Sequence, residues 1–273
     1  MNKKLLLRLF LIAVAATIFR VIIQLLMPPT NDGGAPWPPS IIVKLGLIPV
    51  VFTIYGIFVY GSLAVIFSLI QNELPGKKII KGLIFGLAFG LMWAIYLFEP
   101  SVSAPSTLIS LLEYPIADGI TLLILGIIVG RFIGVNSDVP FIFILPSRAF
   151  AFIVFPLLLL PARYLAYTVI NLDSAYATKP QGTLIWVAIV GLWIGIMYLV
   201  FRPCIASKSL IAKAVLFGFC IFGIDLLLFN SFIPLVFEYN IIKVLIRTAI
   251  DIVPITIAVF VFELINVKKN MII

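Results

Sequence analysis

The feature that most limits how this chain can fold is a series of long apolar runs, separated by short stretches rich in proline, glycine and charged residues. As a helix rising about 1.5 Å per residue, a run of about twenty residues crosses a hydrocarbon layer of about 30 Å. The sequence therefore predicts an all-α membrane protein with about eight transmembrane helices. The runs lie near residues 5–27, 41–70, 79–98, 108–133, 148–170, 183–201, 213–233 and 241–265.

The composition agrees with this fold class and excludes several kinds of function. Hydrophobic residues make up 63% of the chain and charged residues only 11%, whereas soluble domains have about 25% charged residues. The sequence has no histidine and only two cysteines, Cys204 and Cys220, so it supports no zinc or haem site, disulfide framework or Ser/His/Asp triad. We therefore expect no metal and no cofactor.

The positive charges predict the orientation of the chain in the membrane. The formal charge is +8, but the cations occupy short clusters between apolar runs, so we expect the lipid bilayer and not nucleic acid as the partner. If every run spans the membrane once, most cations fall on one side, which indicates cytoplasmic termini in the cell (inner) membrane. We expect Lys77, Lys78 and Lys81 to face anionic lipid on this side. The first helix is expected to be retained and not cleaved as a signal peptide. The set on the cytoplasmic side is Lys3, Lys4, Arg8, Lys77, Lys78, Lys81, Arg131, Arg148, Arg202, Lys208, Lys213, Lys268 and Lys269.

A faint internal repeat divides the chain into two halves. A shift of 143 residues places Arg20 on Arg163, and a shift of 133 residues places Asp118 on Asp251. The halves would be residues 1–134 and 144–273, with four helices each. Because an even number of helices makes both halves enter the membrane in the same direction, they would be parallel repeats. Chance matches between apolar segments remain the alternative.

Six charged residues that lie near the middle or in the external half of the predicted spans are the candidate ligand-binding residues. A charge near the bilayer centre costs several kcal/mol, so such residues face protein or water and often mark function. Arg247 and Asp251 are four residues apart and are expected to pair on one helical face, whereas Glu113 is expected at the external interface. The candidates are Arg20, Arg163, Arg247, Asp118, Asp225 and Asp251.

Three functions are compatible with these charges. The leading hypothesis is a cavity between the halves in which arginines bind, and help to transport, an anionic or amphipathic small molecule or lipid head group. The second is a non-catalytic assembly, sensing or immunity factor whose charges only tie helices together. The least favoured is an intramembrane enzyme that uses Asp118 and Asp251 as a pair, because the Tyr-Asp and Gly-x-Gly-Asp signatures of intramembrane aspartic proteases are missing.

The spacing of Gly86 and Gly90 predicts close helix packing.

Overall fold

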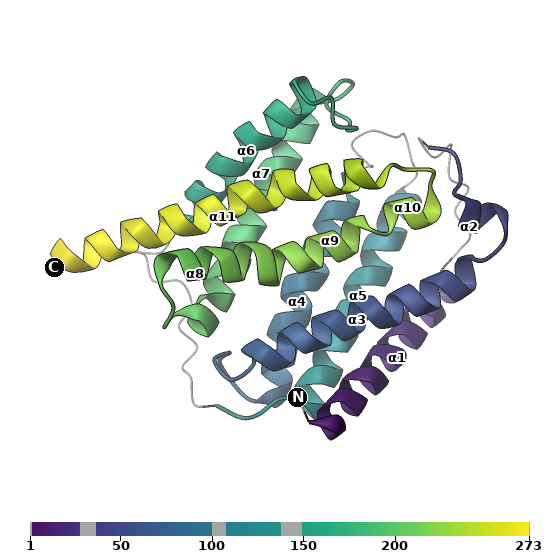
Figure 1. Cartoon of the computed structure of the whole chain (residues 1–273), viewed down its shortest axis with the longest axis horizontal. Coiled ribbons are helices and arrows are strands. Elements are labelled where there is room, and N and C mark those ends of the chain that lie inside the picture. Colours follow the sequence, from purple (N-terminus) through teal and green to yellow (C-terminus); the bar gives the residue numbers. More distant parts are fainter. Residues whose placement is uncertain (1, 28–36, 100–107, 138–148, 273) are drawn as a thin grey trace. The chain divides into compact units, whose positions relative to one another are not determined.

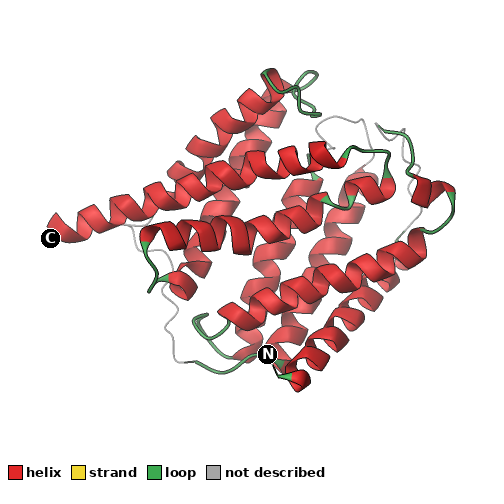
Figure 2. Ribbon diagram, viewed as in Figure 1, coloured by secondary structure: helices red, strands yellow, loops and turns green. Residues whose placement is uncertain are grey.

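The structure is a computed structural model that describes residues 2–27, 37–99, 108–137 and 149–272, and within these ranges it contains helices and no β-strand (Figure 1 and Figure 2). Eight of the helical segments in these ranges are long and apolar enough to cross a membrane. The prediction of an all-α membrane protein with about eight transmembrane helices is therefore confirmed.

The chain divides into two compact units. Unit 1 comprises Met1–Pro140 and Ser231–Ile241, and unit 2 comprises Phe141–Asn230 and Ile242–Ile273. The helices of unit 1 are α1 (Lys3–Leu26), α2 (Ile41–Lys44), α3 (Ile48–Ile70), α4 (Lys78–Leu97), α5 (Leu108–Phe132) and α10 (Ile233–Val236). Those of unit 2 are α6 (Ala151–Thr168), α7 (Pro180–Phe201), η3 (Arg202–Ile205), α8 (Leu210–Val215), η4 (Leu216–Gly223), α9 (Ile224–Asn230) and α11 (Ile241–Ile272).

The second predicted span, residues 41–70, consists of two helices. Ser40 caps the short α2, since its Oγ accepts a hydrogen bond from Val43 N at 3.3 Å. Gly46 then adopts a φ of +67°, a left-handed conformation that glycine tolerates. Pro49 lies in the first turn of α3, where its missing N–H costs nothing. The run is longer than one crossing requires because its first residues form the separate helix α2, ahead of the membrane-spanning helix α3.

Glycines hold α4 and α5 together in unit 1. A Cβ atom on Gly82 would collide with the backbone at Gly126, and a Cβ atom on Gly86 would collide with the backbone of α5 at Leu122. A Cβ atom on Gly90 would lie 3.0 Å from Gly119 O, which is also unusually close. Small residues let the two backbones approach in this way. The packing role predicted for Gly86 and Gly90 is confirmed, and it extends to Gly82.

The seventh span in unit 2 is continuous but irregular. It runs through α8, η4 and α9, and η4 is a π-helix of 8 residues. Gly218 in η4 lies against Thr256 of α11 so closely that a Cβ atom there would overlap the threonine side chain. A π-helical turn often occurs at a functional site, and here it ends two residues before Asp225, one of the predicted site residues.

Lys81 does not face lipid as the sequence predicted. Its side chain is fully buried in unit 1, and its Nζ donates a hydrogen bond to Gln71 O at 2.6 Å. The prediction was wrong because charge clusters show on which side of the membrane a loop lies, but not which way each side chain points. Lys77 and Lys78 are exposed at the start of α4.

Candidate functional site

In unit 1, Arg20 on α1 forms an ion pair with Asp118 on α5, through Arg20 Nε and Asp118 Oδ1. Arg20 Nη1 donates a hydrogen bond to Gln24 Oε1 at 2.8 Å, and Gln24 Nε2 donates one to Glu113 Oε1 at 2.9 Å. Arg20 and Gln24 are one helical turn apart on α1, so they lie on the same face. These four residues therefore form one hydrogen-bonded chain, which we call the Arg20 cluster.

The Arg20 cluster retains groups that can bind a ligand. The side chains of Arg20 and Asp118 are 20% and 14% exposed. Arg20 Nη2 and Asp118 Oδ2 have no hydrogen-bond partner among the described residues. Glu113 Oε2 is buried and also lacks a partner within those residues. Since a buried carboxylate oxygen without a donor is costly, Glu113 needs a donor from outside this set.

Glu113 was predicted to face the external interface, but its exposed fraction is only 4%. The prediction considered α5 alone, on which Glu113 and Asp118 point in different directions. The structure links them through α1 instead, because Arg20 and Gln24 each bind one of the two acids. Gln24 was detectable in the sequence, since it lies four residues after Arg20, an arginine within a predicted span.

In unit 2, Arg163 on α6 forms a closed pair with Asp251 on α11. Arg163 Nε donates to Asp251 Oδ1 at 2.6 Å and Nη2 donates to Oδ2 at 2.5 Å, which is the bidentate geometry of a strong ion pair. Arg163 Nη1 donates to the Tyr167 hydroxyl at 3.1 Å. The side chains of Arg163 and Asp251 are 1% and 0% exposed.

Aromatic rings surround the Arg163 guanidinium. Its carbon atom Cζ lies 5.2 Å from the ring centroid of Trp186 and 5.9 Å from that of Tyr167. Both distances permit a cation–π attraction. Each Arg163 side-chain nitrogen therefore has a hydrogen-bond partner within the protein, and two aromatic rings lie within cation–π distance, so the pair resembles a fixed tie between α6 and α11 more than a binding site.

The two remaining predicted residues, Arg247 and Asp225, are also buried in unit 2, with exposed fractions of 8% and 1%. Arg247 Nη1 donates to the backbone oxygen of Asp173 at 3.1 Å, and the Asp173 carboxylate pairs with Lys243 at 3.1 Å. Both oxygens of Asp251 accept hydrogen bonds from Arg163. The expected pairing of Arg247 with Asp251 stays a prediction.

The structure thus sorts the six predicted residues by unit. Arg20 and Asp118 pair in unit 1, Arg163 and Asp251 pair in unit 2, and Arg247 and Asp225 belong to unit 2. Asp118 and Asp251 each accept a hydrogen bond from an arginine of their own unit, so the partner of each aspartate within its unit is a cation.

A second charged cluster in the structure was not predicted from the sequence. Glu263 on α11 is fully buried and binds Tyr198, Arg202 and Lys213 in unit 2. Glu263 lies inside the predicted span 241–265, so an acid within an apolar run was the available signal. Arg202 and Lys213 were interpreted only as indicators of topology.

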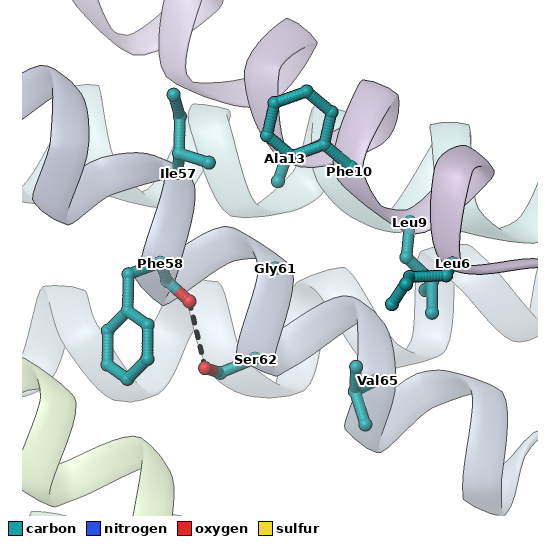
Figure 3. Close-up of a pocket in the computed structure, with 9 residues that line it drawn as sticks. All are labelled: Leu6, Leu9, Phe10, Ala13, Ile57, Phe58, Gly61, Ser62 and Val65. Atoms are coloured by element: carbon teal, nitrogen blue, oxygen red, sulfur yellow. Dashed lines mark hydrogen bonds between the residues drawn. The ribbon is translucent and has the colours of Figure 1, made fainter. Parts of the chain in front are cut away.

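Two grooves on the units are apolar. One, of about 270 Å³, lies between α1 and α3 and is lined by residues such as Leu9, Phe10 and Phe58 (Figure 3). The other, of about 230 Å³, is lined by Ile211, Ile257 and neighbouring residues of unit 2. Neither groove is lined by any of the six predicted site residues. Among the described residues, no group of three or more His, Cys, Asp or Glu side chains is placed to hold a metal ion.

Comparisons with known proteins give no further identification, because no family model, no curated protein and no solved structure matches the chain. The functional argument therefore depends on the residues alone. Of the two Arg–Asp pairs, only the Arg20 cluster combines partial exposure with polar atoms that lack partners among the described residues. It is the candidate site.

Proposed function

We propose that the protein is an integral protein of the cell membrane that binds an amphipathic molecule with a primary ammonium group at the Arg20 cluster. The observation that carries this proposal is the buried Glu113 Oε2, which has no hydrogen-bond partner among the described residues. An ammonium group has three N–H donors and a positive charge, which such a carboxylate oxygen requires. Asp118 Oδ2 offers a second acceptor in the same cluster.

The charges of the cluster favour this ligand class. One cation, Arg20, stands beside two carboxylates, Asp118 and Glu113. A purely anionic ligand, one of the two kinds that the sequence suggested, would meet an excess of negative charge. An ammonium group balances that excess, and a neighbouring phosphate in the same head group would find the open Nη2 edge of Arg20. Among the sequence hypotheses, the amphipathic ligand therefore has more support than the simple anion.

The depth of the cluster also suits a lipid-like ligand. Gln24 and Arg20 lie two and six residues before the last residue of α1, about 3 Å and 9 Å along the helix axis. The polar atoms therefore begin near the end of the helix and continue inward. An amphipathic molecule can place its head group there while its chain remains among apolar side chains.

Binding to vesicle lipids provides the test. We expect the purified protein in nanodiscs to be stabilised by phosphatidylethanolamine relative to phosphatidylcholine with the same acyl chains, because only the former has ammonium N–H donors. Glu113→Gln should abolish this preference. Glu73→Gln makes the same change at an exposed position of unit 1 and should retain it. Equal stabilisation of the wild-type protein by both lipids would contradict the proposal.

A non-catalytic structural role is the second candidate function. The closed Arg163–Asp251 pair favours it for unit 2, since none of the three Arg163 nitrogens is left without a hydrogen bond. In this case the protein would serve as a membrane assembly, sensing or immunity component. This function would be favoured if the wild-type protein showed no preference between the two lipids and Glu113→Gln changed nothing.

We further propose that the termini are cytoplasmic and that the halves 1–134 and 144–273 are parallel repeats. The repeat is supported by the matching roles of Arg20 and Arg163, each of which pairs with an aspartate and with the side chain four residues later. In a variant with Cys204 and Cys220 replaced by serine, cysteine at Ala177 should react with an impermeant reagent from outside the cell. Cysteine at Lys78 should not react, and the reverse pattern would invert the orientation.

A further inference from the structure

The cluster around Glu263 in unit 2 joins the end of α7, the start of α8 and the last turns of the α11 span. Glu263 Oε1 accepts hydrogen bonds from the Tyr198 hydroxyl at 2.6 Å and from Arg202 Nε. Glu263 Oε2 accepts from Arg202 Nη2 at 3.2 Å and from Lys213 Nζ at 2.9 Å. One carboxylate therefore fixes two cationic side chains beside each other.

The cluster has more positive charge and more donors than the protein itself uses. Two cations face one carboxylate, which leaves a net charge of one positive unit. Lys213 Nζ has one hydrogen-bond partner among the described residues for its three N–H groups, and Arg202 donates to Glu263 through only two of its three nitrogens. The side chains of Arg202 and Lys213 are 19% and 11% exposed, whereas Glu263 is 1% exposed. The two cations are thus the members of the cluster that retain some exposed surface.

The position of the cluster corresponds to the edge of the apolar span. Arg202 directly follows the last residue of α7, and Lys213 is the fourth residue of α8. Glu263 lies four residues before the end of the span Ile241–Val267, about 6 Å along the helix axis. Lipid head groups and the adjoining water occupy this depth.

We infer that Arg202 and Lys213 form a binding site for a phosphate group. A guanidinium donates to phosphate oxygens in a planar fork, and an ammonium adds a compact positive charge. Glu263 and Tyr198 hold both cations in place before the ligand arrives, so binding requires little ordering of these long side chains. The phosphate belongs either to the head group of an anionic phospholipid or to a soluble phosphate ester. This site is independent of the Arg20 cluster.

The experiment compares four ligands on the whole protein in phosphatidylcholine nanodiscs by native mass spectrometry. Phosphatidic acid tests the lipid source, glycerol 3-phosphate and inorganic phosphate test the soluble source, and oleic acid tests negative charge without phosphate. We expect a phosphate ligand to bind more tightly than oleic acid. Binding of phosphatidic acid alone would assign the site to lipid, and binding of the soluble compounds would assign it to a phosphate ester.

Two matched variants locate the site. Lys213→Gln should weaken phosphate binding about tenfold, because it removes one charge-assisted contact. Lys208→Gln removes the same charge from an exposed position of the same connection and should change the affinity less than about twofold. If Lys213→Gln does not fold, Lys213→Arg should fold and bind. Equal binding of phosphatidic acid and oleic acid to the wild type, or equal effects of the two glutamine variants, would overturn the inference.

Discussion

The two intramembrane Arg–Asp pairs use the same residue types in similar settings, but they differ in how completely the protein satisfies them. Arg163 binds both oxygens of Asp251, bonds Tyr167 and lies against the ring of Trp186, with almost no exposed surface. Arg20 binds one oxygen of Asp118 and bonds Gln24, and the pair keeps part of its surface exposed. A charge within a span is therefore not enough to identify a binding site. A pair whose donors and acceptors are all used within the protein is a structural contact, whereas a pair with unused donors or acceptors can bind a ligand.

The largest expected effect concerns the closed pair. Arg163→Gln leaves the fully buried Asp251 without its cation, and breaking a buried pair in this way costs about 3–5 kcal/mol. We expect a correspondingly large loss in the free energy of unfolding, measured in mixed micelles by titration with a denaturing detergent. The double variant Arg163→Met with Asp251→Leu removes both charges and should recover most of this loss. A single variant as stable as the wild type would show that the pair is not a structural tie.

The matched change in unit 1 should cost much less. Arg20→Gln removes a cation from a partly exposed pair, for which about 1 kcal/mol is expected. The same unfolding titration measures the difference between the two glutamine variants. Comparable losses in the free energy of unfolding for Arg20→Gln and Arg163→Gln would mean that the two pairs stabilise the protein equally. The reason for placing the ligand in unit 1 would then be removed.

A smaller effect is expected from the aromatic side of the closed pair. Tyr167→Phe removes the hydroxyl that accepts from Arg163 Nη1 while keeping the ring. Hydrogen bonds within membrane proteins contribute about 0.6 kcal/mol on average, so we expect a destabilisation of this order in the unfolding titration. Tyr167→Leu also removes the ring and should cost more. If both variants lose the same amount, the ring makes no separate contribution.

Apolar runs and charge clusters predicted the helices well but described their faces poorly. The runs located all eight spans because length and hydropathy decide whether a helix can cross a membrane. They could not show the break before Pro49 or the π-helix at Leu216–Gly223, because neither changes the hydropathy of the run. Both the lipid-facing and the protein-facing sides of a membrane helix are apolar, so the hydropathy of a run does not show which side faces the protein. The burial of Lys81 was therefore also not predictable.

The candidate site was predictable in part for a similar reason. The six charges near the middle or in the external half of the spans were identified from the sequence, since a charge deep within an apolar run is conspicuous. Their partners depend on which helices pack together, and the sequence does not contain that information in a readable form. Glu113 was consequently assigned to the interface, although Gln24 binds it. Glu263 was missed because its two cations lie outside the apolar runs or at their ends, where they also serve as indicators of orientation.

The dependence of each pair on salt provides the finest test of the contrast. Salt screens charges that water can reach, whereas it has little effect on a fully buried pair. In a double-mutant cycle, the coupling energy between Arg20 and Asp118 should fall by about 0.3 kcal/mol when the ionic strength is raised from low to high. The coupling between Arg163 and Asp251 should stay constant, because their side chains are 1% and 0% exposed. Two couplings that are equally insensitive to salt would indicate that water does not reach Arg20, and a ligand head group would then have no route to the cluster from the aqueous side.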